Sequence, residues 1–230
     1  MPMTTSFRGS NLDHWFLNSA IANIGDATGL PGAATVGSLY VSLHTASPGV
    51  GGNQTTNETT YGAYARVAVA RSGSGWTRTG NSLSPVAHVD FPEATSGSST
   101  VYFWGLGASS SGSGTLLWFG GIGPSPVPFT AVASTDIFVV PGQSFSVSDT
   151  LCFWQVTGQS LPTGVSEGTV YYVKTVSGSS ITISATEGGA TIDITTDGAG
   201  FIQKLTPIAV VTTPTPVTPR LKNTSTFVLD

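Results

Sequence analysis

Three histidines and the acids near them are the side chains with which this chain could hold a metal ion. His14 follows Asp13, His88 lies two residues before Asp90, and His44 ends a segment that alternates like a strand. Adjacent residues of a helix do not face each other, and the chain has no HExxH or CxxC motif. We therefore predict no metal site, and expect the histidines to form hydrogen bonds with the backbone or with solvent.

Two pairs of carboxylates have the residue types needed for glycoside hydrolysis, namely Asp90 with Glu93 and Asp193 with Asp197. Neither pair falls in a segment whose pattern indicates a cleft. No G-x-S-x-G motif presents a serine nucleophile, and TTDGAG around Asp197 lacks the spacing of a calcium loop. The sequence therefore predicts no catalytic residue, no cofactor and no enzyme.

Aromatic rings are the candidates for a binding surface, because flat rings stack on the faces of sugars. The set is Tyr40, Tyr61, Tyr64, Trp76, Trp104, Trp118 and Trp154. Rings in β-rich sequence also pack cores, so we expect core positions for most of them, with a host glycan as the alternative ligand. The single cysteine, Cys152, excludes an intrachain disulfide and predicts a buried thiol.

Charged residues make up only 9% of the chain, against about 25% in ordinary globular proteins. Twelve acids and eight bases give a net charge of −4, with no run of lysine or arginine, so we expect no nucleic-acid partner. Glycine, serine and proline interrupt the apolar segments, so we expect no membrane span and no signal peptide. A surface of hydroxyl groups suits a protein that packs against other subunits.

One short helix is predicted near the N-terminus. In SNLDHWFLNSAIANIG, Ser10 and Asp13 have the spacing of a capping box. Apolar residues recur at helical spacing through Ile24, and Gly25 predicts the end of the helix.

From residue 39 onward the hydrophobic period is two. In LYVSLHTA, Leu39, Val41 and Leu43 point toward a core, which leaves His44 on the outer or intersubunit face. Further strands are predicted in AYARVAVARS, HVDFPEA, TVYFWGLGAS, TLLWFGGI and FTAVASTDIFVVPGQSFSV, the last with two strands, the second after Pro141-Gly142. Short strands divided by glycine and serine favour an all-β fold, a β-sandwich of jelly-roll type over residues 1–148.

Two further parts follow the predicted sandwich. Residues 149–205 form a small second β module, with a hairpin over Ser177-Gly178. Residues 206–230 form an extended C-terminal arm, since its prolines cannot sit inside a central strand. The arm ends in TFVL, which needs an apolar surface, either on its own domain or on a neighbouring subunit.

Four segments, LDHWFLNSAI, LYVSLHTASPGVGGNQTTNETTYGAYARVAV, GTLLWFGG and DIFVVPGQSFSV, together resemble a family of tailed-bacteriophage virion structural proteins. Its members are variously described as tail fibre, minor tail or capsid-associated proteins, and the resemblance covers residues 10–148. LPTGVSEGTVYYV and SATEGGATIDI resemble β modules that recur in phage structural proteins. The resemblance implies a β-sandwich virion component assembled in several copies, without catalytic residues. Within it Glu58 and Arg66 could pair, and an exposed pair would contribute roughly 0–1 kcal/mol.

These observations predict a non-enzymatic virion structural protein, assembled in the host cytoplasm. Our first expectation is a capsid decoration or cement protein that forms a homotrimer and contacts the major capsid protein or tail proteins. The alternative is a tail fibre or tail-tip protein that takes part in host receptor binding, with the second module at the receptor end.

Overall fold

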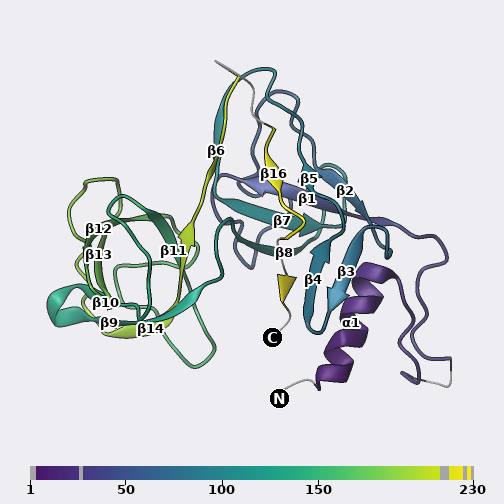
Figure 1. Ribbon diagram of the computed structural model, residues 1–230, viewed down its shortest axis with the longest axis horizontal. Helices are drawn as coiled ribbons and strands as arrows, with labels where there is room; N and C mark the ends of the chain where they lie inside the picture. Colours follow the sequence, from purple (N-terminus) through teal and green to yellow (C-terminus); the bar gives the residue numbers. More distant parts are fainter. Residues whose placement is uncertain (1–3, 26–27, 213–217, 225–226, 229–230) are drawn as a thin grey trace.

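The computed structural model describes residues 4–25, 28–212, 218–224 and 227–228, and this part of the chain is almost entirely β. Figure 1 shows two lobes, one built from α1 and strands β1 to β8, the other from strands β9 to β14. The predicted all-β class with a single N-terminal helix is confirmed. Within the described residues, no helix combines the length and the apolar character needed to cross a membrane.

Helix α1 (Thr5–Leu17) begins earlier and ends earlier than the sequence predicts. Thr4 is the N-cap, and its hydroxyl oxygen accepts a hydrogen bond from the Phe7 amide at 3.3 Å. Asn18 adopts the left-handed conformation that ends the helix. The predicted cap at Ser10 is wrong, because Ser10 lies inside the helix, and the Asp13 carboxylate of the predicted capping box accepts from the Arg78 guanidinium at 2.9 Å.

A four-stranded antiparallel sheet forms the centre of the first lobe. Its order is β2 (Val67–Ala70), β1 (Ser38–His44), β7 (Phe103–Gly107) and β8 (Leu116–Gly121). Leu39, Val41 and Leu43 pack into one core with Leu12 and Phe16 of α1, as the alternation predicts.

The remaining strands of this lobe form three small sheets that the arm completes. They are β3 (Trp76–Thr79), β4 (Ser82–Pro85), β5 (Val89–Asp90), β6 (Ser99–Val101), β15 (Ile208–Val210), β16 (Arg220–Leu221) and β17 (Phe227–Val228). Strand β15 pairs with β6, β16 with β5, and β17 with β4. Figure 1 shows β16, in yellow, beside β5. Of the two partners considered for the arm, its own N-terminal lobe is the one observed.

Replacing Val210 of the arm with alanine should lower the free energy of unfolding by about 2 kcal/mol, because its side chain is fully buried in the first core. Chemical unfolding followed by tryptophan fluorescence measures this loss. Val147→Ala is the control, since Val147 is 60% exposed. The variant should keep the oligomeric mass of the unchanged protein in light scattering, and a smaller mass would instead place the arm on a neighbouring subunit.

The second lobe is a closed antiparallel barrel in the order β10-β13-β12-β11-β14-β9. The strands are β9 (Val127–Val132), β10 (Ile137–Val139), β11 (Thr150–Trp154), β12 (Tyr171–Ser177), β13 (Ser180–Ser184) and β14 (Gly198–Leu205), with a short 3-10 helix at Ala133–Thr135. Its core contains Phe129, Phe138 and Phe153, whose ring centroids lie 5.0–5.6 Å apart. The predicted hairpin is confirmed, since Ser177 pairs with Ser180.

The barrel takes strands from both sides of residue 149, where the second module was expected to begin. The strand predicted after Pro141-Gly142 is wrong, because β10 precedes this turn and places Phe138 in the barrel core. The described strands thus form a sheet, three small sheets and a barrel, while a jelly-roll connection and the exact limits of folding units stay predictions.

Candidate functional site

His44 is fully buried, which corrects its predicted place on an outer face. Its Nε2 lies 2.8 Å from the Ser42 hydroxyl, and its Nδ1 lies 2.8 Å from the carbonyl oxygen of Thr56. The segment that contains Thr56 covers this second face of β1, which a period of two in the strand itself does not predict.

The other two histidines also contact the backbone, as predicted. His14 Nδ1 lies 2.8 Å from the Ser19 carbonyl oxygen, and the Asn223 amide donates to His88 Nδ1 at 3.0 Å. The part of the chain that the structure describes contains no group of three or more His, Cys, Asp or Glu able to hold a metal ion.

The predicted Glu58–Arg66 pair is confirmed, but it is buried where the sequence suggested an exposed pair. The Arg66 guanidinium donates twice to the Glu58 carboxylate at 2.7 Å. The Glu58 side chain is 12% exposed and the Arg66 side chain 3%. The Tyr64 hydroxyl donates to the same carboxylate at 2.8 Å, and burial raises the pKa of this phenol. Arg66 also donates to the Ser109 and Gly112 carbonyl oxygens in the loop between β7 and β8, so the pair holds this loop against the segment between β1 and β2.

Burial lowers the pKa of His44, and the positive charge of Arg66 lowers it as well. The hydrogen bond to the Thr56 carbonyl and the negative charge of Glu58 raise it, but burial has the largest effect. The imidazole is therefore neutral in the folded protein, and its contribution to stability is complete above the unfolded-state pKa of about 6.5. That contribution is lost as the pH falls through this value toward the folded-state pKa. The melting temperature should thus fall between pH 7.5 and 5.5, and fall less in His44→Gln. An equal fall in both proteins would contradict this assignment.

The candidate carboxylates have structural partners on the arm and in turns. Asp90 accepts from Arg220 of the arm at 2.9 Å, and Glu93 accepts from the Thr218 hydroxyl at 2.7 Å. Asp197 accepts from the Ala133 amide at 2.8 Å, as expected for a turn residue, while Asp193 is exposed. Cys152 is buried as predicted, and burial raises the pKa of its thiol.

Most of the candidate aromatic residues pack in the core, as expected. Trp76 is buried against Phe16, with ring centroids 5.0 Å apart, and the rings of Tyr61 and Tyr64 lie 5.3 Å apart. Trp118 packs on α1, where its ring centroid lies 5.2 Å from that of Phe16. Trp104 and Trp154 are only half-buried, and both line a cleft between the sheet and the barrel, which the buried Trp76 also borders.

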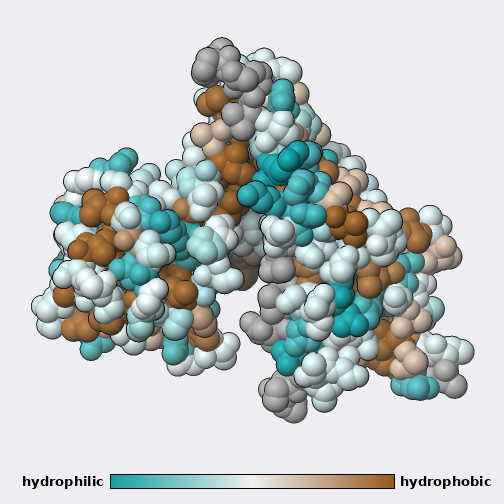
Figure 2. Space-filling view, in the orientation of Figure 1, coloured by the Kyte–Doolittle hydropathy of each residue, from teal (hydrophilic) through white to brown (hydrophobic). Residues whose placement is uncertain are grey.

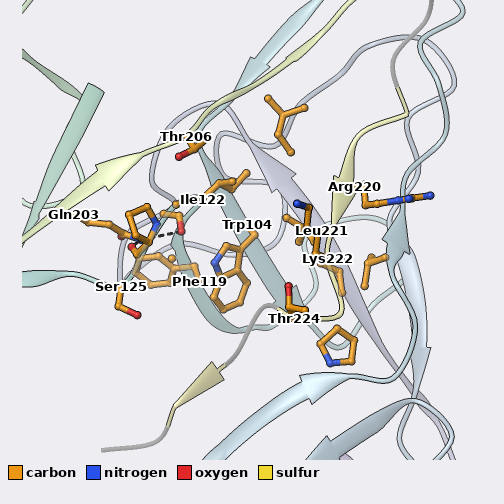
Figure 3. A pocket seen from close by; sticks show the side chains of 18 of the residues that line it. Trp104, Phe119, Ile122, Ser125, Gln203, Thr206, Arg220, Leu221, Lys222 and Thr224 are labelled. Carbon is orange, nitrogen blue, oxygen red and sulfur yellow. Dashed lines mark hydrogen bonds between the residues drawn. The ribbon is translucent and has the colours of Figure 1, made fainter. Parts of the chain in front are cut away.

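The cleft has a volume of about 810 Å³. Trp104 of β7, Phe119 of β8 and Trp154 of β11 contribute aromatic rings to it, and residues 220–222 and Thr224 of the arm line it as well. Figure 3 shows Trp104 and Phe119 between Gln203 and Ser125 on one side and Leu221, Lys222 and Thr224 on the other. Figure 2 shows that the molecule is hollowed between its two lobes.

Gln203 of β14 joins the sheet to the barrel beside this cleft. Its amide nitrogen donates to the carbonyl oxygens of Gly121 at 3.1 Å and Pro124 at 3.0 Å, and its amide oxygen accepts from Trp154 Nε1 at 2.9 Å. A Cβ on Gly121 would lie 2.6 Å from the Gln203 amide oxygen, so only glycine fits there. A small core of Phe103, Cys152 and Leu205 continues the junction. The cleft walls are therefore fixed relative to each other.

A family model described as "Podophage GP4 fiber I protein gp80" matches residues 19–148, more than half of the 230 residues. The chain belongs to this family. Comparison with curated proteins found no match. The predicted resemblance to phage virion proteins is thereby confirmed at the level of a virion structural protein, and the chain is a component of the phage particle.

The match to the gp80 fibre family runs from the residues after α1 to the segment after β10. It includes the whole four-stranded sheet with Trp104 and Phe119, and also Trp76 of β3, so three rings of the cleft lie within the match. Trp154, Gln203 and the arm lie outside the match. Sequence reasoning missed Phe119 and Gln203, for which the available signal was the Gly120-Gly121 pair within a strand, since such glycines mark a close approach of another backbone or side chain.

Among the described residues that line the cleft are two cations, Arg220 and Lys222, and no carboxylate. No serine, histidine and acid come together there as a nucleophile with its base. In the gp80-family chain this arrangement offers aromatic faces, hydroxyl groups and positive charge to a ligand.

Proposed function

We propose that the chain is a non-enzymatic fibre component of the virion, in which the gp80-family part contacts other virion proteins and the barrel is held in a fixed orientation beyond it. The observation that carries this proposal is the family match, because the family is described as a fibre protein. This description favours the fibre alternative over decoration of the capsid.

The partners of the candidate catalytic side chains support a non-enzymatic role. His44 is bonded to Ser42 and Thr56 inside the first lobe, and Asp90 is bonded to Arg220 of the arm. Each of these side chains thus forms a contact that stabilises the fold. We therefore expect purified protein to leave bacterial polysaccharides intact.

Exposed apolar side chains support assembly with further copies of this chain, for which we propose a trimer. On the described surface of the first lobe, large apolar side chains that are at least 40% exposed include Trp15, Leu30, Val36 and Leu117. Light scattering after size exclusion should give three times the chain mass of 23.5 kDa. A monomer at micromolar concentration would exclude the proposed assembly.

Labelling the barrel in intact particles tests the fibre role. The turn at residues 186–189 between β13 and β14 carries exposed residues and accepts a short peptide tag. Gold particles directed to this tag should appear on fibres of the particle in electron micrographs, whereas untagged particles are the control. Gold spread over the capsid facets would show that decoration is the correct role.

A further inference from the structure

We propose that the cleft between the sheet and the barrel binds a saccharide that carries an acidic group. Trp104, Phe119 and Trp154 would contact the faces of sugar rings, and Lys222 would pair with the acid. This inference rests on the proposed fibre role, since a fibre meets the polysaccharide of a bacterial surface, and it names the ligand class of that role.

The rings are held in place before any ligand arrives. The Trp154 indole is fixed by its hydrogen bond to Gln203, and its ring centroid lies 6.1 Å from that of Phe119 at an interplanar angle of 52°. Rings that are already ordered lose little conformational entropy on binding. Because their planes differ, they offer faces to successive sugars of a chain that bends.

Glycine keeps the floor of the cleft open beside Trp104. A Cβ at Gly120 would lie 3.1 Å from the indole nitrogen of Trp104 and would fill space next to the ring. The volume of about 810 Å³ lies within the range of small-ligand pockets, roughly 300–1,000 Å³. The cleft therefore has room for several sugar units.

The charge of the cleft is opposite to that of the whole chain. The chain has a net charge of −4 and only eight lysines and arginines, yet two of them line this cleft, with no carboxylate among the described lining residues. The carboxylate of Asp90, which does not line the cleft, neutralises the positive charge of Arg220. Lys222 is thus the cation that gives the cleft its positive charge, and Ser125, Thr206 and Thr224 supply hydroxyl groups for the sugar.

An array of bacterial surface oligosaccharides, in which each uronic-acid member is paired with its carboxyl-reduced form, tests the proposal with the full-length protein. We expect at least one acidic member to bind more strongly than its reduced form. In titration calorimetry with that oligosaccharide, Phe119→Ala should weaken binding about tenfold or more, a loss of stacking worth roughly 1.4 kcal/mol or more. Lys222→Gln should weaken binding of the acidic form alone.

Two matched variants control for general effects. Phe7→Ala removes a partly exposed ring from α1, and Lys174→Gln removes a cation from β12, and neither residue lines the cleft. Both should bind as the unchanged protein does. Because Lys222 is exposed, its variant keeps the fold even if Phe119→Ala does not.

Three results would overturn the proposal: no bound oligosaccharide, equal binding of acidic and reduced forms, or equal affinity of the cleft and control variants. If the cleft instead accepted a segment of another virion protein, the purified chain would bind none of the array. The gold label on intact particles reports the fibre role separately. If the label lies on fibres and no saccharide binds, the saccharide proposal is wrong while the fibre role holds. If the label lies on the capsid, the fibre role itself is wrong.

Discussion

Replacing Glu58 with glutamine should lower the free energy of unfolding by about 3–5 kcal/mol, because it leaves the buried Arg66 guanidinium without its counter-charge. Urea unfolding at pH 7 measures the loss. Asp90→Asn is the matched control, since it breaks an exposed ion pair. The Asp90 side chain is 43% exposed and that of its partner Arg220 is 47% exposed. We expect the control to unfold at the same urea concentration as the unchanged protein, because water and salt screen an exposed pair.

The expected loss is large because the pair connects segments that no strand holds together. Arg66 donates to carbonyl oxygens at Ser109 and Gly112, and the buried Gln54 side chain exchanges two hydrogen bonds with the Ser109 backbone. Amide hydrogen exchange in residues 108–114 should therefore accelerate in Glu58→Gln. Losses of similar size in Glu58→Gln and Asp90→Asn would show that burial does not strengthen the pair.

The strand around His44 shows which part of the fold the sequence predicts. Leu39, Val41 and Leu43 are apolar and alternate, so one face of β1 is predicted correctly. The opposite face carries Ser42 and His44, and polar residues at this spacing usually indicate contact with solvent. Here both are fully buried, with the Thr56 carbonyl as partner of the imidazole. A buried polar face depends on a segment from elsewhere in the chain, which a local pattern does not contain.

The helix shows the same limit for a capping signal. Ser10 and Asp13 have the spacing of a capping box, but the Ser10 hydroxyl donates back to the Ser6 carbonyl oxygen within the helix. Asp13 binds Arg78, which lies 65 residues further along the chain. A carboxylate that a distant cation binds is not available to complete a capping box, and the helix begins where Thr4 provides the N-cap.

The cleft could be predicted only in part. Trp104 and Trp154 were among the candidate rings, because their residue type alone suggests stacking. Their meeting in one cleft depends on contacts such as that between Gln203 and Gly121, which are 82 residues apart. No periodicity within β8 or β14 contains that information, so Phe119 and Gln203 become functional candidates only once the two lobes are placed against each other.

Replacing Gln203 with leucine should separate the two lobes while each keeps its own core. The substitution keeps the approximate volume but leaves the Gly121 and Pro124 carbonyl oxygens and the Trp154 indole N–H without their partner. Unpaired buried polar groups cost about 1–3 kcal/mol each, and some will reach water, so we expect a loss of roughly 2–4 kcal/mol. The exposed Gln155→Leu is the control and should change little.

Calorimetry and small-angle scattering distinguish a loss of coupling from a loss of fold. Among the described residues, the first and second cores share no member, and the small cluster of Phe103, Cys152 and Leu205 lies between them, with Tyr102, Trp154 and Val170 packed against it. Gln203→Leu should therefore unfold in two transitions and show a larger radius of gyration, and its saccharide affinity should fall because Trp154 loses its fixed orientation. A single transition with unchanged dimensions would mean that this apolar cluster alone sets the angle between sheet and barrel, and that the glutamine orients only the indole.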